Sequence, residues 1–106
     1  MTMLPAWVLP TDAVETATPA LPATAYCDDR LCEQFGIEEA RDLVRLAQLA
    51  PTGQLAQVFV RRTYFITVEA QNALLKLLED PPLHTYFGFV VSPQVALLPT
   101  LRSRIQ

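Results

Sequence analysis

The fold of this chain is decided by the segment Ile66–Pro82, which reads ITVEAQNALLKLLEDPP. Thr67 is a favourable N-cap residue for a helix. The apolar side chains that follow it have the spacing of one helix face, and they are Ala70, Leu74, Leu77 and Leu78. The helix should end at Asp80, because a residue that precedes a proline is disfavoured in the α region. The segment therefore predicts one amphipathic helix that packs its leucines into a core.

The segments around this helix predict strands and a second helix. Thr85–Val91 is apolar nearly throughout, as expected of a strand buried on both faces of a parallel sheet. Gln57–Val60 is a β-branched and aromatic run of strand length. From Ile37, apolar residues at helical spacing predict a helix that Pro51 and Gly53 end. This alternation of helix and strand is typical of a parallel α/β sheet with right-handed crossovers.

The two ends of the chain give weaker patterns. Ala6–Leu9 predicts a short strand bounded by prolines, and Ala23–Cys27 predicts a second one. The stretch Pro10–Pro22 between them is expected to be loop or weak helix. Near the other end, Gln94–Leu98 is expected to form a short turn of helix, and Pro99 begins the last segment.

The composition limits the classes of function. A chain of 106 residues with 51% apolar residues suffices for one small packed domain. The net charge of −3 and the single lysine, Lys76, argue against strong direct binding to nucleic acid. No apolar run approaches the roughly 20 residues that a membrane helix needs, and the N-terminus lacks the pattern of a signal peptide. We therefore expect a cytoplasmic protein without a membrane partner.

The cysteines and the histidine do not predict a metal site. Four residues separate Cys27 from Cys32, no second Cys or His pair lies near them, and His84 is the only histidine. A zinc site needs three or four such ligands. We expect reduced, partly buried thiols and no metal.

Two blocks of the C-terminal half carry a family resemblance. Glu69–Pro82 is similar to the motif E-A-x-N-A-L-L-K-x-L-E-[ED]-P-P, and Leu97–Arg104 is similar to L-L-P-T-I-x-S-R-C. Both motifs are found in the gamma/tau and delta-prime subunits of bacterial DNA polymerase III clamp loaders. Phe35–Arg41 resembles a helix that lies further upstream in the same family. An ordinary amphipathic helix would not require the polar residues between the leucines, which are Glu69, Gln71, Asn72 and Lys76.

The resemblance implies a fold and a domain organisation. It implies an α/β fold, namely a partial AAA+ (RecA-like) three-layer domain with a mainly parallel sheet flanked by helices. It covers roughly residues 35–106, whereas residues 1–34 form an irregular, proline-rich part that matches only loosely. We therefore expect one reduced AAA+ core domain over residues 1–106. The helical lid and the collar that follow this point in the family have no room within this length, so we expect either a fragment of a longer gene product or a stand-alone reduced domain.

The family's phosphate-binding loop is not found in the sequence. Such a loop has the form G-x-x-x-x-G-K-[ST] and holds phosphates through its backbone N–H groups and its lysine. The glycines of this chain lie far apart, at Gly36, Gly53 and Gly88. Where the loop would begin after the first strand, the sequence is Pro10-Thr11-Asp12-Ala13. We expect neither ATP nor another cofactor to bind.

The family's other ATP-handling positions are also altered. The acidic Walker B pair, which holds Mg²⁺, aligns with Arg61-Arg62-Thr63, and two cations cannot bind Mg²⁺ by the family's route. For Arg61 and Arg62 we expect a solvated strand end in preference to a phosphate-binding role. Ser92 aligns approximately with the family's sensor position, although a serine that opens a turn is equally ordinary. The chain is therefore predicted not to be an enzyme.

Ser103-Arg104 is the remaining candidate for chemistry. In the family this arginine is presented to the ATP of the neighbouring subunit, where such an arginine finger stabilises charge on the transferred phosphoryl group. Ile105 stands where the family has cysteine, and the alternative is that Arg104 is an ordinary surface arginine.

The sequence thus predicts a non-catalytic, delta-prime-like component of DNA replication that acts by protein–protein contact. Its partners would be other clamp-loader and DNA polymerase III subunits, above all a gamma/tau-like ATPase. The alternative is a degenerate AAA+ scaffold or adaptor with no role in replication.

Overall fold

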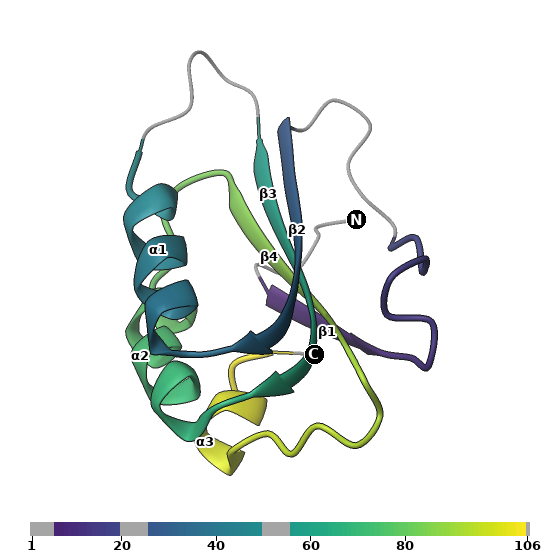
Figure 1. Cartoon of the computed structure of the whole chain (residues 1–106). Helices are drawn as coiled ribbons and strands as arrows, with labels where there is room; N and C mark the ends of the chain where they lie inside the picture. Colours follow the sequence, from purple (N-terminus) through teal and green to yellow (C-terminus); the bar gives the residue numbers. More distant parts are fainter. Residues whose placement is uncertain (1–5, 20–25, 50–55, 106) are drawn as a thin grey trace.

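The computed structural model describes residues 6–19, 26–49 and 56–105 and shows a four-stranded parallel sheet with helices against one face (Figure 1). The strands are β1 (Ala6–Pro10), β2 (Tyr26–Phe35), β3 (Gln57–Ile66) and β4 (Thr85–Val91), in the spatial order β1-β4-β3-β2. The helices are α1 (Ile37–Ala47), α2 (Val68–Glu79) and α3 (Pro99–Arg102). The predicted α/β fold with a parallel sheet is confirmed.

The main core lies between the sheet and the pair of helices α1 and α2. The rings of Phe59 and Phe87 stack with their centroids 5.8 Å apart on this face of the sheet. Leu43 of α1 and Leu74 of α2 pack against the same core and are buried. On the opposite face, the part of the chain that the structure describes supplies turns of residues 11–19 instead of a helix (Figure 1).

The ends of α2 follow the sequence signals. The side-chain oxygen of Thr67 accepts a hydrogen bond from the backbone N–H of Ala70 at 3.1 Å, so the predicted N-cap is confirmed. The helix ends at Glu79, and Asp80 caps it immediately before the two prolines. Helix α1 ends at Ala47, and Pro51 and Gly53, which were expected to end it, lie outside the described residues.

Strand β1 packs closely on β4, and a glycine makes this possible. Trp7 lies opposite Gly88 in the parallel register of the two strands. A Cβ atom at residue 88 would lie 2.0 Å from Cη2 of the Trp7 indole, a distance that no packed carbon atoms tolerate. The indole therefore covers β4 at the one position of that strand without a side chain.

Two strands are longer than the sequence predicted. Strand β2 was expected at Ala23–Cys27, but it continues to Phe35, and residues 23–25 lie outside the described part. Strand β3 was expected to end at Val60 but continues to Ile66. The two strands pair along their whole described length, and arginines of one pair with aspartates of the other. Pairing of strands with complementary charges has overridden the low strand propensity of these polar residues.

The short helix expected at Gln94–Leu98 is not formed. A turn follows Ser92, whose carbonyl accepts a hydrogen bond from the N–H of Val95 at 3.0 Å, and the backbone then runs without helix to Pro99. The Gln71 side chain bonds the backbone of this run at Ala96 and Leu98, and these side-chain contacts take the place of helical hydrogen bonds. Pro99 is the first residue of α3, as predicted for the start of the last segment.

Within the described ranges, no helix has the length and apolar content that crossing a membrane requires.

Candidate functional site

The two arginines at the predicted Walker B positions lie inside β3. The expectation of a solvated strand end is wrong for both residues, because the strand continues past them. Arg61 is only 4% exposed, and the Arg62 side chain is 12% exposed. A buried guanidinium is tolerated only when it is paired and hydrogen-bonded. Strand β2 supplies the partners, which are Asp28 and Asp29.

Arg61 occupies the face of the sheet that α1 and α2 cover. Its Nη1 donates to the carbonyl oxygen of Asp28 at 2.7 Å and lies 3.5 Å from the Asp28 carboxylate. The guanidinium carbon lies 5.6 Å from the centroid of the Phe59 ring, within the range of a cation–π contact. Burial lowers the pKa of the Arg61 guanidinium, and the charge of Asp28 opposes that shift. Its Nη2 has no hydrogen-bond partner among the described residues.

Arg62 points to the opposite face and binds the segment that follows β1. Its Nε and Nη2 donate to the two carboxylate oxygens of Asp29 at 2.8 and 3.0 Å, a bidentate ion pair. Its Nη1 donates to the carbonyl oxygens of Val14 and Ala17 at 3.0 and 2.6 Å. The hydrogen bond with Asp29 raises the pKa of Arg62. Arg62 therefore ties the polypeptide that follows β1 to the middle of the sheet.

Thr63 and Ser92, the other aligned positions, meet where β4 ends: Ser92 follows β4 directly, and Thr63 lies inside β3 opposite Val91. Thr63 is fully buried, and its hydroxyl accepts a hydrogen bond from the N–H of Phe65 at 3.3 Å. The backbone N–H of Ser92 lies 3.4 Å from the carbonyl oxygen of Thr63. The Ser92 hydroxyl is hydrogen-bonded to the side chain of Gln94. The Thr63 hydroxyl also lies within hydrogen-bond distance of the Glu33 carbonyl oxygen of β2, at 3.2 Å, so both side chains already have partners within the chain. Among the described residues, no three metal-binding side chains converge on a common point.

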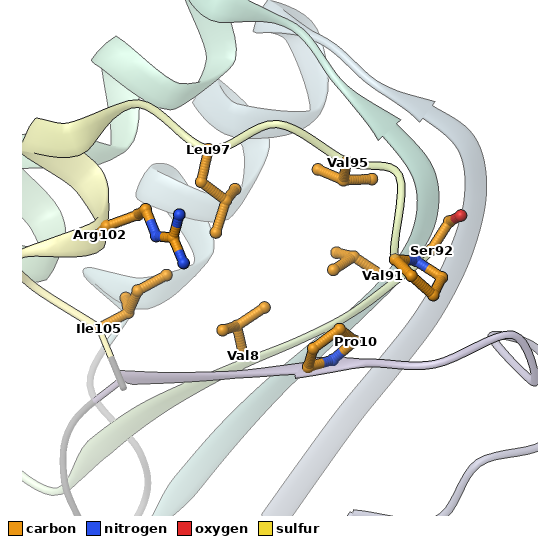
Figure 2. Close-up of a pocket in the computed structure, with 9 residues that line it drawn as sticks. Val8, Pro10, Val91, Ser92, Val95, Leu97, Arg102 and Ile105 are labelled. Atoms are coloured by element: carbon orange, nitrogen blue, oxygen red, sulfur yellow. The ribbon is translucent and has the colours of Figure 1, made fainter.

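A pocket of about 390 Å³ lies beside these strand ends, between β1 and the segment that leads into α3. Its lining residues are Val8, Pro10, Val91, Ser92, Pro93, Val95, Leu97, Arg102 and Ile105. Figure 2 shows the Arg102 guanidinium directed into the space between Leu97 and Ile105. Arg102 is exposed and is the one charged residue of the lining. The sequence did not predict this pocket, because its residues come from three separate segments of the chain.

Arg104, the predicted arginine finger, is folded back onto its own chain. Its Nη1 donates to the carbonyl oxygen of Thr100 at 2.6 Å, and its Nη2 lies 3.4 Å from a carboxylate oxygen of Glu79 at the end of α2. The side chain is 29% exposed, and its Nε has no hydrogen-bond partner in the described part of the chain. Ser103 precedes it and donates its hydroxyl to the Thr100 carbonyl at 2.9 Å.

Gln71 connects the two sequence blocks that carry the resemblance. It is 1% exposed, and its Nε2 donates to the carbonyl oxygens of Ile66 and Ala96 at 3.3 and 3.0 Å. Its Oε1 accepts a hydrogen bond from the N–H of Leu98 at 2.6 Å. The sequence identified Gln71 as an unusual polar residue among leucines, but only the structure shows what it binds.

The cysteines do not join the site. Both are free, and Cys32 is half-buried as expected, whereas Cys27 is exposed and the expectation of partial burial is wrong for it. They lie five positions apart on one strand and therefore face opposite sides of the sheet. Burial raises the pKa of both thiols, and the charges of Asp29 and Asp28 add to this effect at Cys27.

Comparison with known proteins connects this geometry to one family. The family described as "DNA polymerase III, delta subunit" matches residues 15–106. Subunit delta' of DNA polymerase III from Yersinia pestis is 41% identical over 71 residues, which cover 66% of this chain and 21% of the relative. Subunit delta' from Escherichia coli K12 is 39% identical over the same length, with the same coverage of both chains.

Subunit gamma/tau from Mycobacterium tuberculosis H37Rv is 39% identical over 70 residues, which cover 65% of this chain and 12% of the relative. This chain therefore matches between 12% and 21% of the length of these curated relatives.

Proposed function

Because this chain belongs to the DNA polymerase III delta-subunit family, we propose that it is a non-catalytic clamp-loader component. We propose that it acts through contact with an ATP-hydrolysing subunit. Its relatives carry the names of the gamma/tau and delta' subunits. The proposed partner is a subunit of the gamma/tau type. The proposed contribution of this chain is an arginine, Arg104, delivered to the partner's ATP.

The observation that carries the non-catalytic part of the proposal is the pairing of Arg61 and Arg62 with Asp28 and Asp29. A Walker B site needs free carboxylates to hold Mg²⁺ near the phosphates. Here the aligned positions are cationic, and the nearest carboxylates of the neighbouring strand are already neutralised by them. A phosphate-binding loop needs free backbone N–H donors. In the segment after β1, the N–H groups of Thr11, Ala13, Thr16 and Ala17 already donate to acceptors within the chain.

The role of Arg104 is supported by its place on a short, accessible segment. It follows α3 directly, and 29% of its side chain is exposed. Its contacts are with one exposed carboxylate and with oxygens of its own turn, and such contacts are easily exchanged. A guanidinium is planar and permanently charged, so it can bind the oxygens of a phosphate in a bidentate manner. Arg104 could therefore leave its present partners for a nucleotide bound to a neighbouring subunit.

The proposal is tested by mixing the full chain with the gamma/tau ATPase of the same organism and measuring phosphate release. Arg104→Ala should lower the stimulated rate of phosphate release by about tenfold or more. An arginine finger can increase the rate of phosphoryl transfer by about 10³–10⁵-fold. The matched control is Arg102→Ala, which removes the same charge two residues away and should leave the stimulation intact. Equal stimulation by wild type and Arg104→Ala would show that the finger role is wrong.

The competing hypothesis is a scaffold or adaptor without a role in replication. A direct binding measurement distinguishes it from the clamp-loader proposal. The immobilised chain should retain purified gamma/tau subunit, whereas an adaptor outside replication would retain none. Calorimetry with Mg²⁺ and ATP tests the non-catalytic part independently. We expect no heat of binding to the isolated chain, and saturable binding would overturn this part of the proposal.

A further inference from the structure

We propose that Glu79 is a positioning residue that holds Arg104 in a withdrawn position and thereby limits its delivery to a neighbouring ATPase. This inference rests on the function proposed above and adds a regulatory contact to it. It follows from the ion pair between the last residue of α2 and the segment after α3, in which Nη2 of Arg104 lies 3.4 Å from Oε2 of Glu79.

The electrostatics of α2 favour this ion pair. Glu79 is the last residue of the helix, where the partial negative charge of the backbone carbonyls makes a carboxylate unfavourable. A cation at this end of the helix relieves this effect, and Arg104 is the residue that the structure places against Glu79.

The same helix fixes the position from which Arg104 reaches back. The Gln71 side chain holds the N–H of Leu98, the residue that caps the start of α3. Helix α3 has only four residues, so Arg104 lies a short and defined distance beyond this anchor. Helix α2 therefore determines both the place where the segment begins and the carboxylate that its arginine meets.

The withdrawn position leaves part of the guanidinium unsatisfied. Nη1 donates to the carbonyl oxygen of Thr100, and Nη2 faces Glu79, but the buried Nε has no hydrogen-bond partner among the described residues. A guanidinium carries five N–H donors, and a phosphate group offers several acceptors to it at once. A phosphate within reach could therefore satisfy more of the N–H donors of Arg104 than Glu79 does, which favours the release of Arg104 from Glu79.

The ion pair between Glu79 and Arg104 is weak enough to act as a reversible restraint. The side chains of Glu79 and Arg104 are 65% and 29% exposed, and an ion pair with this exposure shifts a two-state equilibrium by only about two- to fivefold. A restraint of this size lowers the fraction of extended Arg104 without preventing its extension. Removal of the Glu79 charge should therefore increase the stimulated rate by about the same factor.

The experiment measures the stimulated phosphate release of the gamma/tau ATPase at saturating concentrations of the full chain. Glu79→Gln should raise the maximal rate about two- to fivefold and leave the half-saturating concentration unchanged. The matched control, Asp80→Asn, removes a neighbouring carboxylate that makes no ion pair in the described part of the chain and should give the wild-type rate. The double variant Glu79→Gln with Arg104→Ala should behave as Arg104→Ala alone.

A gain in rate separates the restraint from structural damage, which would lower the rate. The ¹⁵N–¹Hε resonance of Arg104 gives a second readout and should shift in Glu79→Gln but not in Asp80→Asn. If Arg104→Ala abolishes stimulation and Glu79→Gln does not increase it, the restraint is refuted and the proposed function stands. If Arg104→Ala has no effect, the proposed finger is refuted, and the restraint loses its role with it.

Discussion

The side-chain oxygen of Gln71 lies 2.6 Å from the backbone nitrogen of Leu98, across 27 positions of sequence. This hydrogen bond joins α2 to the segment that leads into α3, and two further bonds from the same amide reach the carbonyls of Ile66 and Ala96. The residue is buried beside a core made of apolar side chains. The position of Arg104 therefore depends on a polar contact made inside the core.

Replacement of Gln71 by leucine should loosen this connection. Leucine has a similar size but leaves the carbonyls of Ile66 and Ala96 and the N–H of Leu98 without their side-chain partner, so we expect a loss of about 1–3 kcal/mol in the free energy of unfolding. Urea denaturation measures this loss, and hydrogen exchange at Leu98 should become faster. Asn72→Leu is the control, because Asn72 is the exposed neighbour. Equal stability of the two variants would contradict the role given to Gln71.

Replacement of Arg61 by alanine should destabilise the chain strongly. Asp28 would lose a buried partner, and we expect a loss of about 3 kcal/mol, the low end for breaking a buried ion pair, because Arg30 also neutralises this carboxylate. Arg61→Met retains the apolar stem against Phe59 but still leaves the carboxylate behind.

Addition of Asp28→Asn to Arg61→Met should recover part of the lost stability, because it removes a mostly buried carboxylate that then has only Arg30 as a partner. Thermal or urea unfolding of the two single variants and the double variant gives the coupling energy. Additive effects of the two changes would mean that this pair is not an interacting unit in solution.

A methyl group at residue 88 should not fit beneath Trp7. Gly88→Ala places a carbon atom 2.0 Å from the indole, and we expect a loss of about 1–3 kcal/mol, the usual range for overpacking. Combination with Trp7→Leu should make the alanine almost neutral, because the clashing ring is gone. Gly36→Ala is the control, since its new Cβ would meet only the flexible end of Glu39 at 3.3 Å. A fully stable Gly88→Ala variant would disprove the β1–β4 packing.

Asp42 should contribute a small, pH-dependent part of the stability. The hydrogen bond from Arg45, at 2.6 Å, and the charges of Arg45 and Arg30 hold the pKa of Asp42 below its usual value of 3.8. A carboxyl group with a lowered folded-state pKa stabilises the fold above 3.8, and that contribution is lost as the pH falls further through the folded-state pKa.

The side chain of Asp42 is 38% exposed, so Asp42→Asn should lower the free energy of unfolding by only about 0.2–1 kcal/mol at neutral pH. Denaturation curves recorded from pH 7 down to pH 2 should bring the variant and the wild type together. A difference that persists unchanged at the lowest pH would contradict this assignment.

Much of the fold could be predicted because its signals are local. The apolar spacing of α2, the N-cap at Thr67 and the continuous apolar run of β4 each depend on residues close together in sequence. Strand β2 could not be predicted in the same way. Its polar middle, from Asp28 to Arg30, has the composition of a loop, and it pairs as a strand because arginines of β3 reach its aspartates. These ion pairs are diagonal, since Asp28 and Asp29 lie opposite Phe59 and Val60 in the register.

The same distinction between local and long-range signals holds for the candidate site. The sequence singled out Arg61, Arg62 and Arg104. It predicted that the first two would be exposed to solvent, and it did not predict which groups Arg104 would contact. Burial and pairing are properties of two segments brought together. A reading of one segment cannot show that Asp28 lies beside Arg61 or that Glu79 lies beside Arg104.

The sequence by itself determined the family, the parallel α/β class and the presence of two arginines where the resemblance predicts the Walker B positions. These depend on residue identity and on short-range periodicity, which are fixed before the chain folds. Only the tertiary structure decided that the two arginines of β3 are paired with aspartates of β2, that Gln71 anchors the segment before α3, and that Arg104 meets Glu79. The physical reason is that hydrogen bonds and ion pairs depend on distance and burial, and residues far apart in the chain acquire both only when the sheet and its helices assemble.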